Sequence, residues 1–255
     1  MEYASSGIPP HKSLVLDRIT KRYGSVLAVS NVSLLLDDRE FLAVVGPTGC
    51  GKTTLLRLIA GFEKPNEGHI FIHGQCVDHL KPSRRGVRMV FQDNALWPHM
   101  RVFDKYSYSN LSFSLKIRSR HPREIGKQVD SISKRLGIGR RLYRRKPAQL
   151  SEGQKQMVGI GRAMTIKPVI LLMDEPFSNI DPQQRLTLRR ELKDYHDEMR
   201  TTTVYVTHNL PEAFAVADRM AMMKEGKIIQ IDTPSRIRKH PADQFVSDFI
   251  RCSAM

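Results

Sequence analysis

A glycine-rich segment at residues 46–53, GPTGCGKT, carries the residue types that hold nucleotide phosphates. It has the spacing of a phosphate-binding loop and lies between an apolar run, residues 41–45, and a stretch with helical leucine spacing. In such loops the glycines let backbone N–H groups surround a phosphate, the lysine reaches the β- and γ-phosphates, and the hydroxyl ligates Mg²⁺. We therefore expect a nucleoside triphosphate with Mg²⁺ here, and a chance glycine turn is the weaker alternative. The predicted contacts are Gly46, Pro47, Thr48, Gly49, Cys50, Gly51, Lys52, Thr53 and Thr54.

Two adjacent acids, Asp174 and Glu175, follow five apolar residues at 169–173. A buried parallel strand that ends in two acids places them at the carboxyl edge of an open α/β sheet, where ligands bind. Asp174 is then suited to hold Mg²⁺ and its water shell, and Glu175 to orient or deprotonate an attacking water. The alternative is a pair of solvated acids in a loop, which leaves the apolar run unexplained.

Two further strand-like segments end in polar residues suited to the same edge. Residues 201–209 are rich in β-branched types and end in His208, where a γ-phosphate contact is a better interpretation than a structural or exposed histidine. The apolar segment 88–92 ends in Gln92, whose side chain is expected to reach Mg²⁺ or the attacking water. Asp181 followed by proline predicts the start of a helix, with Asp181 as its N-cap.

The composition is that of a globular protein with a strong excess of positive charge. The 255 residues include 41 Lys and Arg against 26 Asp and Glu, a formal net charge of +15. Three cysteines show neither a disulfide framework nor metal-ligand spacing, which fits a reducing compartment. The first twelve residues, MEYASSGIPPHK, lack the apolar core of a signal peptide, and no run of about 18 apolar residues appears, so no membrane span is expected.

These segments, in this order, resemble the ATP-binding cassette (ABC) ATPases over about residues 14–250. The resemblance rests on GPTGCGKT, on ILLMDE at 170–175 and above all on LSEGQ at 150–154, which matches the family's signature motif. It implies ATP as the nucleotide, together with ATP hydrolysis. The family pattern assigns adenine stacking to Tyr23, nucleotide contacts also to Ser151, Gly153, Gln154 and Asp181, catalytic roles to Glu175, His208 and Gln92, and magnesium ligation to Thr53, Gln92 and Asp174.

The signature motif is expected to act as a second half-site. Ser151 should cap a helix that begins near Gln154 and leave its N–H groups unpaired, and an unpaired helix start attracts anions. The family's architecture implies that this helix start points away from the chain's own phosphate loop. Two chains related by a two-fold axis would then each complete the other's site. Glu152 stands where the family usually has glycine, and we expect its side chain to point outward.

The resemblance also predicts the fold class, α/β, and the organisation of the chain. It implies a P-loop NTPase (RecA-like) core with an antiparallel β subdomain and an inserted α-helical signature subdomain. We expect the core at residues 1–92 and 166–255 and the helical subdomain at 93–165, all within one ABC ATPase domain spanning residues 1–255. No C-terminal regulatory domain is expected.

Three segments, 91–104, 111–118 and 231–250, are similar to the importer ATPases for sugars, polyamines and ferric iron. This similarity implies a transmembrane ABC permease as a direct partner, a second copy of the chain or a paralogous ATPase, and a solute-binding protein acting indirectly. It places the protein peripherally on the cytoplasmic face of the inner membrane. Segment 100–118 is about five residues longer than the family's run, near residues 105–109, and is expected to face the permease.

Other functional classes remain as alternatives. Segment 93–165 holds 16 Lys and Arg against 5 Asp and Glu, a net of +11, which fits a solvated face, anionic lipid or acidic permease loops, or nucleic acid. A soluble ABC ATPase acting on ribosomes or nucleic acid ranks behind an importer, because no RNA-binding motif or second cassette is present, and no nucleic acid is expected. A non-hydrolysing regulator conflicts with the complete set of catalytic residue types. His69 and His73, on one face of a predicted strand, lack further ligands for zinc.

Overall fold

The computed structural model describes residues 12–252. Within that range no helix combines the length and the apolar character needed to cross a membrane. The expectation that the first residues form no signal peptide lies outside the described residues, apart from Lys12.

A six-stranded, mostly parallel sheet is the centre of the fold. Its central strands, β3, β8 and β7, are buried along their whole length, which is why their sequences are almost continuously apolar or β-branched. β3 pairs in parallel with β8 and β9, β8 pairs in parallel with β7, and β10 runs antiparallel to β9. In spatial order the strands are β10 (Lys227–Asp232), β9 (Arg219–Lys224), β3 (Phe41–Val45), β8 (Thr202–Thr207), β7 (Ile170–Asp174) and β6 (Val87–Val90).

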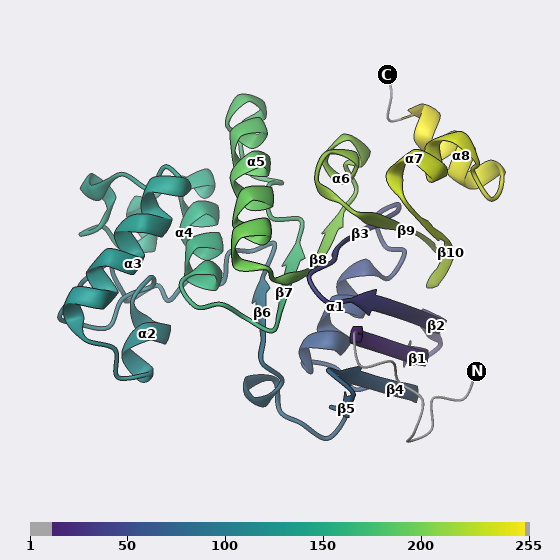
Figure 1. Ribbon diagram of the computed structural model, residues 1–255, viewed down its shortest axis with the longest axis horizontal. Coiled ribbons are helices and arrows are strands. Elements are labelled where there is room, and N and C mark those ends of the chain that lie inside the picture. Colours follow the sequence, from purple (N-terminus) through teal and green to yellow (C-terminus); the bar gives the residue numbers. More distant parts are fainter. Residues whose placement is uncertain (1–11, 253–255) are drawn as a thin grey trace. The chain divides into compact units, whose positions relative to one another are not determined.

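A second, antiparallel sheet of four strands bears out the predicted antiparallel β part of the fold. Two long strands, β2 (Val26–Asp37) and β1 (Lys12–Tyr23), form a hairpin, and β4 (Glu67–Ile72) and β5 (Gln75–Cys76) continue the sheet in that order. Figure 1 shows these strands side by side in purple and blue near α1 (Lys52–Ala60). The α/β fold class with its parallel core sheet is thus confirmed.

The chain forms two compact units. The first contains the chain up to Arg88, Val169–Asp174 and the chain from His196 onward, and so carries nearly all of both sheets. Its helices are α1, α6 (Leu210–Val216), α7 (Pro234–Lys239), α8 (Gln244–Cys252) and the short 3₁₀ turn η1 (Pro82–Arg84).

The second unit contains Met89–Pro168 and Glu175–Tyr195 and is helical. The subdomain predicted at residues 93–165 falls within it, although the unit also includes most of α5; the predicted boundaries stay a prediction. Its elements are α2 (Phe113–Ile117), α3 (Pro122–Arg135), η2 (Arg140–Leu142), η3 (Pro147–Gln149), α4 (Glu152–Met164) and the larger part of α5 (Pro182–Met199).

Segment 94–113 is held against α4 by close contacts within this unit. A Cβ on Gly159 would lie 3.2 Å from the carbonyl oxygen of Asn94, so glycine permits this approach. Arg162 donates to the carbonyl of Ala95 at 2.8 Å and its guanidinium lies 4.7 Å from the centre of the Trp97 ring. The buried Asn110 side chain donates to three carbonyls of residues 97–101 and accepts from the Trp97 N–H. This segment is therefore an ordered layer over the middle of α4.

Candidate nucleotide-binding site

The phosphate loop leaves the end of β3 and encloses its own lysine. Lys52 is 5% exposed, and its ammonium donates to the carbonyls of Gly46 and Pro47, both at 2.8 Å. Its Nζ also lies 3.8 Å from the Sγ of Cys50. Burial raises the pKa of the Cys50 thiol, and the nearby Lys52 charge offsets part of that effect. The Lys52 ammonium is thus held by backbone carbonyls, and phosphate oxygens can replace these carbonyls as its hydrogen-bond partners.

Gly51 opens helix α1 without a capping side chain. It adopts φ 106°, and a Cβ there would lie 2.2 Å from the carbonyl oxygen of Ala28. Only glycine combines this backbone conformation with so close an approach. Because no side chain caps the helix start, the N–H groups of its first turn are available to an anion, which the helix dipole also favours.

The predicted metal ligands Thr53 and Asp174 meet in the first unit. The Thr53 hydroxyl donates to Oδ1 of Asp174 at 3.1 Å, although the two residues are 121 positions apart in sequence. Asp174 ends β7 and is 3% exposed. The two side chains present oxygen atoms at the carboxyl edge of the sheet, next to the phosphate loop.

His208 lies at the same edge of the sheet as the phosphate loop. The strand register pairs Val45 with Thr207 on β8, and Val206 with Asp174 on β7. Gly46 and His208 therefore each follow the last residue of neighbouring parallel strands. His208 is exposed there, and its expected contact with the γ-phosphate stays a prediction.

Tyr23 is positioned by the hairpin of β1 and β2. It is 41% exposed and pairs with Val26 at the hairpin end, while Ala28, further along β2, touches the loop at Gly51. Gly226 also links the hairpin to the phosphate loop, because its N–H donates to the carbonyl of Cys50 and its carbonyl accepts from the N–H of Ser30 on β2. An exposed aromatic ring is thus carried by a hairpin that is fastened to the phosphate loop.

The signature motif in the second unit begins α4 with a reciprocal cap. Ser151 Oγ accepts from the Gln154 N–H at 3.3 Å, and Gln154 Oε1 accepts from the Ser151 N–H at 3.2 Å. The expectation of a serine N-cap is confirmed, but two details were wrong: the helix begins at Glu152 rather than near Gln154, and the Gln154 N–H is paired rather than unpaired. The local reason is the glutamine at the third helical position, which completes a capping box. Glu152 points outward as expected, 62% exposed and 2.5 Å from the Lys155 ammonium.

Gln92 lies in a turn and not at the end of a strand. β6 ends at Val90, two residues earlier than the apolar run suggested, because the backbone turns: the Asn94 N–H donates to the carbonyl of Phe91 at 3.2 Å. Asn94 and Ala95 then have positive φ values of 63° and 42°. Gln92 is exposed and immediately precedes the segment that packs on α4, the helix that the signature opens.

Glu175 and Asp181 lie on the loop between β7 and α5. Glu175 has φ 45°, an unfavourable backbone conformation for a residue with a Cβ, and such conformations gather at functional sites. Asp181 accepts from the N–H of Gln184 at 2.9 Å and so caps α5, as its sequence position predicted. Its expected contact with nucleotide stays a prediction.

A model of the ABC transporter family matches residues 29–178, more than half of the chain. The chain belongs to the ABC transporter family. The matched range includes the phosphate loop, the signature and the Asp174–Glu175 pair, so the family assignment and the site geometry concern the same residues.

Curated relatives of this ABC chain have names that refer to uptake. It is 44% identical over 243 residues to the osmoprotective compounds uptake ATP-binding protein GgtA of Synechocystis, covering 95% of this chain and 65% of that protein. It is equally similar, at 44%, to the sn-glycerol-3-phosphate import ATP-binding protein UgpC of Yersinia pseudotuberculosis, with 95% and 66% covered. The chain therefore spans just under two thirds of the length of these relatives.

Solved ABC cassettes share the fold. The ATP-binding cassette MJ0796, in a dimeric post-hydrolysis state bound to ADP and Pi, matches with a TM-score of 0.78 at 28% identity, covering 87% of this chain and 98% of that one. The cbiO1 protein of Clostridium perfringens, part of the transporter complex cbiONQ, matches with a TM-score of 0.78 at 26% identity, with 91% and 92% covered.

Sequence reasoning missed two features that the ABC fold brings together. One is the carbonyl cage around Lys52, which depends on the path of the loop backbone. The other is a cluster of His69, Cys76 and Asp78 at the β4–β5 hairpin. The two-residue turn His73-Gly74 after Ile72 was the available signal, since a short turn with a glycine predicts a hairpin that returns Cys76 alongside β4.

Proposed function

We propose that this chain binds ATP with Mg²⁺ and hydrolyses it to ADP and phosphate, as the motor subunit of a solute importer. One observation carries the proposal: the Thr53 hydroxyl and the buried Asp174 carboxylate meet beside a phosphate loop whose helix start has no capping side chain. A glycine-lined anion site next to an oxygen-only pair is suited to a phosphate chain with its cation. The ADP- and phosphate-bound MJ0796 cassette supports the same choice of nucleotide.

The residues present fit Mg²⁺. This hard cation prefers oxygen ligands and few protein side chains, and Thr53 and Asp174 offer a hydroxyl and a carboxylate 3.1 Å apart. When bound, the cation neutralises charge that develops on the phosphates. Asp174 already orients the Thr53 hydroxyl, while Lys52 exchanges its two carbonyl partners for phosphate oxygens. Gln92 is the proposed further ligand.

Glu175 is the proposed general base. It follows Asp174 directly, and its positive φ accompanies the turn of the chain at the end of β7. A base acts on water held in line with the γ-phosphate, and Gln92 and His208 are proposed to orient that water and the phosphate. Tyr23 is proposed to stack on the adenine.

A second copy, or a paralogous chain, is proposed to complete each site through its signature. The start of α4 offers N–H groups, the Ser151 hydroxyl and Gly153, all at one end of a 13-residue helix. The dimeric cassette structures support this arrangement. Asp181 is proposed to contribute at the same junction. Binding of ATP would hold two chains together, and hydrolysis would release them.

Import is proposed because the relatives are named for uptake. The partner is a transmembrane permease that receives a solute-binding protein, and the chain acts peripherally at the cytoplasmic face of the inner membrane. The contact is proposed for segment 93–120. Two tyrosines there, Tyr106 and Tyr108, are 77% and 55% exposed, and Asp104 orders their turn by accepting from the N–H groups of Tyr106 and Ser107.

Replacing Glu175 with glutamine tests the hydrolytic assignment. Glu175→Gln keeps the size of the side chain but removes the base, so phosphate release should fall on the order of 10²- to 10⁴-fold. ATP binding should persist, and an ATP-bound dimer should accumulate in size-exclusion chromatography. A matched control is Glu225→Gln, because Glu225 has φ 47° and is 83% exposed on the β9–β10 turn. Near-normal turnover in Glu175→Gln would exclude Glu175 as the base.

A surface variant tests the permease assignment. Tyr106→Ser combined with Tyr108→Ser should lower transport and permease binding while basal ATPase activity stays unchanged. Leu186→Ser is the control, since Leu186 is 57% exposed on α5 in the same unit. Deleting residues 105–109 would be less clean, because the buried Ser109 hydroxyl contacts Ser112 at 2.6 Å. Unchanged permease binding in the double variant would place the contact elsewhere.

A further inference from the structure

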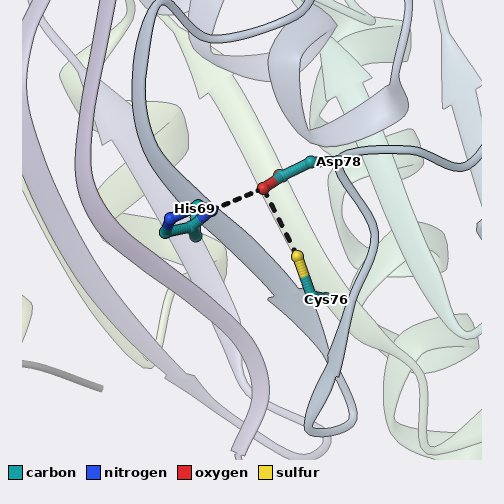
Figure 2. Close-up of side chains that lie close together, drawn as sticks. All are labelled: His69, Cys76 and Asp78. Atoms are coloured by element: carbon teal, nitrogen blue, oxygen red, sulfur yellow. Dashed lines mark hydrogen bonds and ion pairs between the residues drawn. The ribbon is translucent and has the colours of Figure 1, made fainter. Parts of the chain in front are cut away.

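Three side chains with different donor atoms converge at the β4–β5 hairpin. His69 on β4, Cys76 on β5 and Asp78 just beyond it each offer one ligand atom, and these atoms all lie within 4.8 Å of one another. Figure 2 shows the imidazole and the thiol both directed at the Asp78 carboxylate. Oδ2 of Asp78 lies 2.9 Å from Nδ1 of His69 and 3.3 Å from Sγ of Cys76.

The backbone holds these donors in place. The hairpin register pairs Phe71 with Cys76, so Cys76 returns beside the strand that carries His69. Asp78 is fastened by its other oxygen, because Oδ1 accepts from the Ile70 N–H at 3.0 Å. That bond leaves Oδ2 as the atom on which the imidazole and the thiol converge. The three ligands therefore come from one short segment whose geometry is fixed by strand pairing.

We propose that His69, Cys76 and Asp78 bind a divalent metal ion of borderline softness, Zn²⁺ being the best match, with water completing the coordination. The set of one imidazole, one thiolate and one carboxylate is typical of zinc rather than of Mg²⁺ or Ca²⁺. Tetrahedral zinc with its usual bond lengths separates ligand atoms by about 3.5 Å. The observed separations, from 2.9 Å to at most 4.8 Å, bracket that value, so small side-chain rotations suffice.

Binding balances protons and charge in a simple way. The metal takes the place of the hydrogen bond that Cys76 donates to Asp78, and the thiol proton leaves to solvent. His69 would bind through Nδ1 and keep its proton on Nε2, and its side chain is 65% exposed, so the ring can turn and water can reach the ion. The thiolate and the carboxylate bring two negative charges to a 2+ ion. The guanidinium of the nearby buried Arg85 donates hydrogen bonds to the backbone carbonyls of Leu58, Ile59 and Leu80.

This site is separate from the proposed nucleotide site. None of its residues belongs to the phosphate loop, to the signature or to the carboxyl edge of the parallel sheet. The sequence offered His69 and His73 as a pair on one strand, but His73 lies past the end of β4 with φ 46° in the turn. The strand pairing instead supplies the additional ligands from Cys76 and Asp78. Metal binding here would tie the end of the hairpin to β4.

Cobalt binding without nucleotide tests the proposal. The reduced full chain, free of any polyhistidine tag, is titrated with Co²⁺ in the absence of ATP and Mg²⁺, and the thiolate-to-cobalt charge-transfer band is followed; Zn²⁺ should then displace the band. Cys76→Ser should abolish the band. His69→Asn should weaken cobalt binding by at least about tenfold, a cost typical even of changing residues that only support metal ligands. Because His69 is exposed, that variant should fold normally.

Two controls separate this site from other thiols and histidines. Cys252→Ser removes the exposed thiol at the other end of the chain, and His73→Asn changes the neighbouring histidine to a residue that tolerates a positive φ. Both should keep the band. Absence of a band in the wild-type chain, or a band that survives Cys76→Ser, would overturn the proposal. ATP hydrolysis measured on the same variants should be unchanged, so failure here leaves the proposed function standing.

Discussion

Two helix starts are proposed to hold ATP, that of α1 in the first unit and that of α4 in the second, and they differ in how they are capped. α1 begins after Gly51, in a left-handed conformation with no side-chain cap. α4 begins after Ser151, in an extended conformation, with a capping box formed by Ser151 and Gln154. Both helix starts carry partial positive charge, but only α4 partly satisfies its own N–H groups.

The difference in capping fits two different roles in the proposed ATP site. An uncapped helix start with an enclosed lysine is incomplete without a ligand, which suits the half-site that binds ATP first. A capped helix start is stable without a ligand, which suits a surface that binds the phosphate held by a partner chain only when a dimer forms. Ser151 Oγ accepts from the Gln154 N–H and keeps its own hydroxyl proton, so it can donate to that phosphate without giving up the cap.

Mixing two inactive chains should have the largest effect, because it tests whether the two helix starts complete one site. Lys52→Ala removes the phosphate-binding lysine, and Ser151→Arg blocks the signature with a bulky side chain, so each homodimer should be inactive. In a mixed dimer one site combines an intact loop with an intact signature. Phosphate release from a refolded equal mixture should recover to roughly a quarter of wild type, if exchange is random and the sites are independent.

The control for this experiment is proof that mixed dimers form, for example from two tags of different size. If such dimers are present and activity stays at the level of the single variants, the signature does not complete a partner's site. The two helix starts would then have unrelated roles.

Two glycine variants test whether α1 depends on its backbone as described. Gly51→Ala places a Cβ 2.2 Å from the Ala28 carbonyl oxygen at φ 106°, so the loop must shift. Binding of a fluorescent ATP analogue should weaken by at least about tenfold, equivalent to 1.4 kcal/mol. Gly49→Ala is the matched variant: it has φ 80° but open space, so it should lower stability by only about 1–2 kcal/mol from the left-handed backbone. Equal thermal unfolding of the two variants would contradict the role of the Ala28 contact.

The smallest effect is expected at α4. Ser151→Ala removes one half of the capping box and should destabilise the first turn of α4 by about 1 kcal/mol. Hydrogen exchange of the amides at residues 152–156 should become about fivefold faster. Thr233→Ala removes the comparable cap of α7 and should leave exchange in α4 unchanged. Unaltered exchange in Ser151→Ala would mean that the cap does not stabilise the helix start.

Local features of the site could be predicted because neighbouring residues decide them. The phosphate loop lies where its glycines and the apolar run before it indicated, and β3, β7 and β8 match their predicted segments to within two residues. Ser151 and Asp181 are N-caps, as their residue types suggested. The limits of a strand were less certain: a turn ends β6 before Gln92, because backbone hydrogen bonds compete with the apolar pattern there.

Short motifs and the apolar pattern of single strands were enough to predict the family, the parallel core and the residues able to bind phosphate. Which distant atoms meet follows from the packing of the folded chain. The Thr53 hydroxyl reaches Asp174 across 121 residues because β7 and the phosphate loop end at the same sheet edge, and His69 meets Cys76 and Asp78 because a hairpin sets their register. The first contact depends on strand order, which long-range packing fixes and no local pattern encodes. For the second, the turn after Ile72 indicated the hairpin, but the pairing register set which side chains meet.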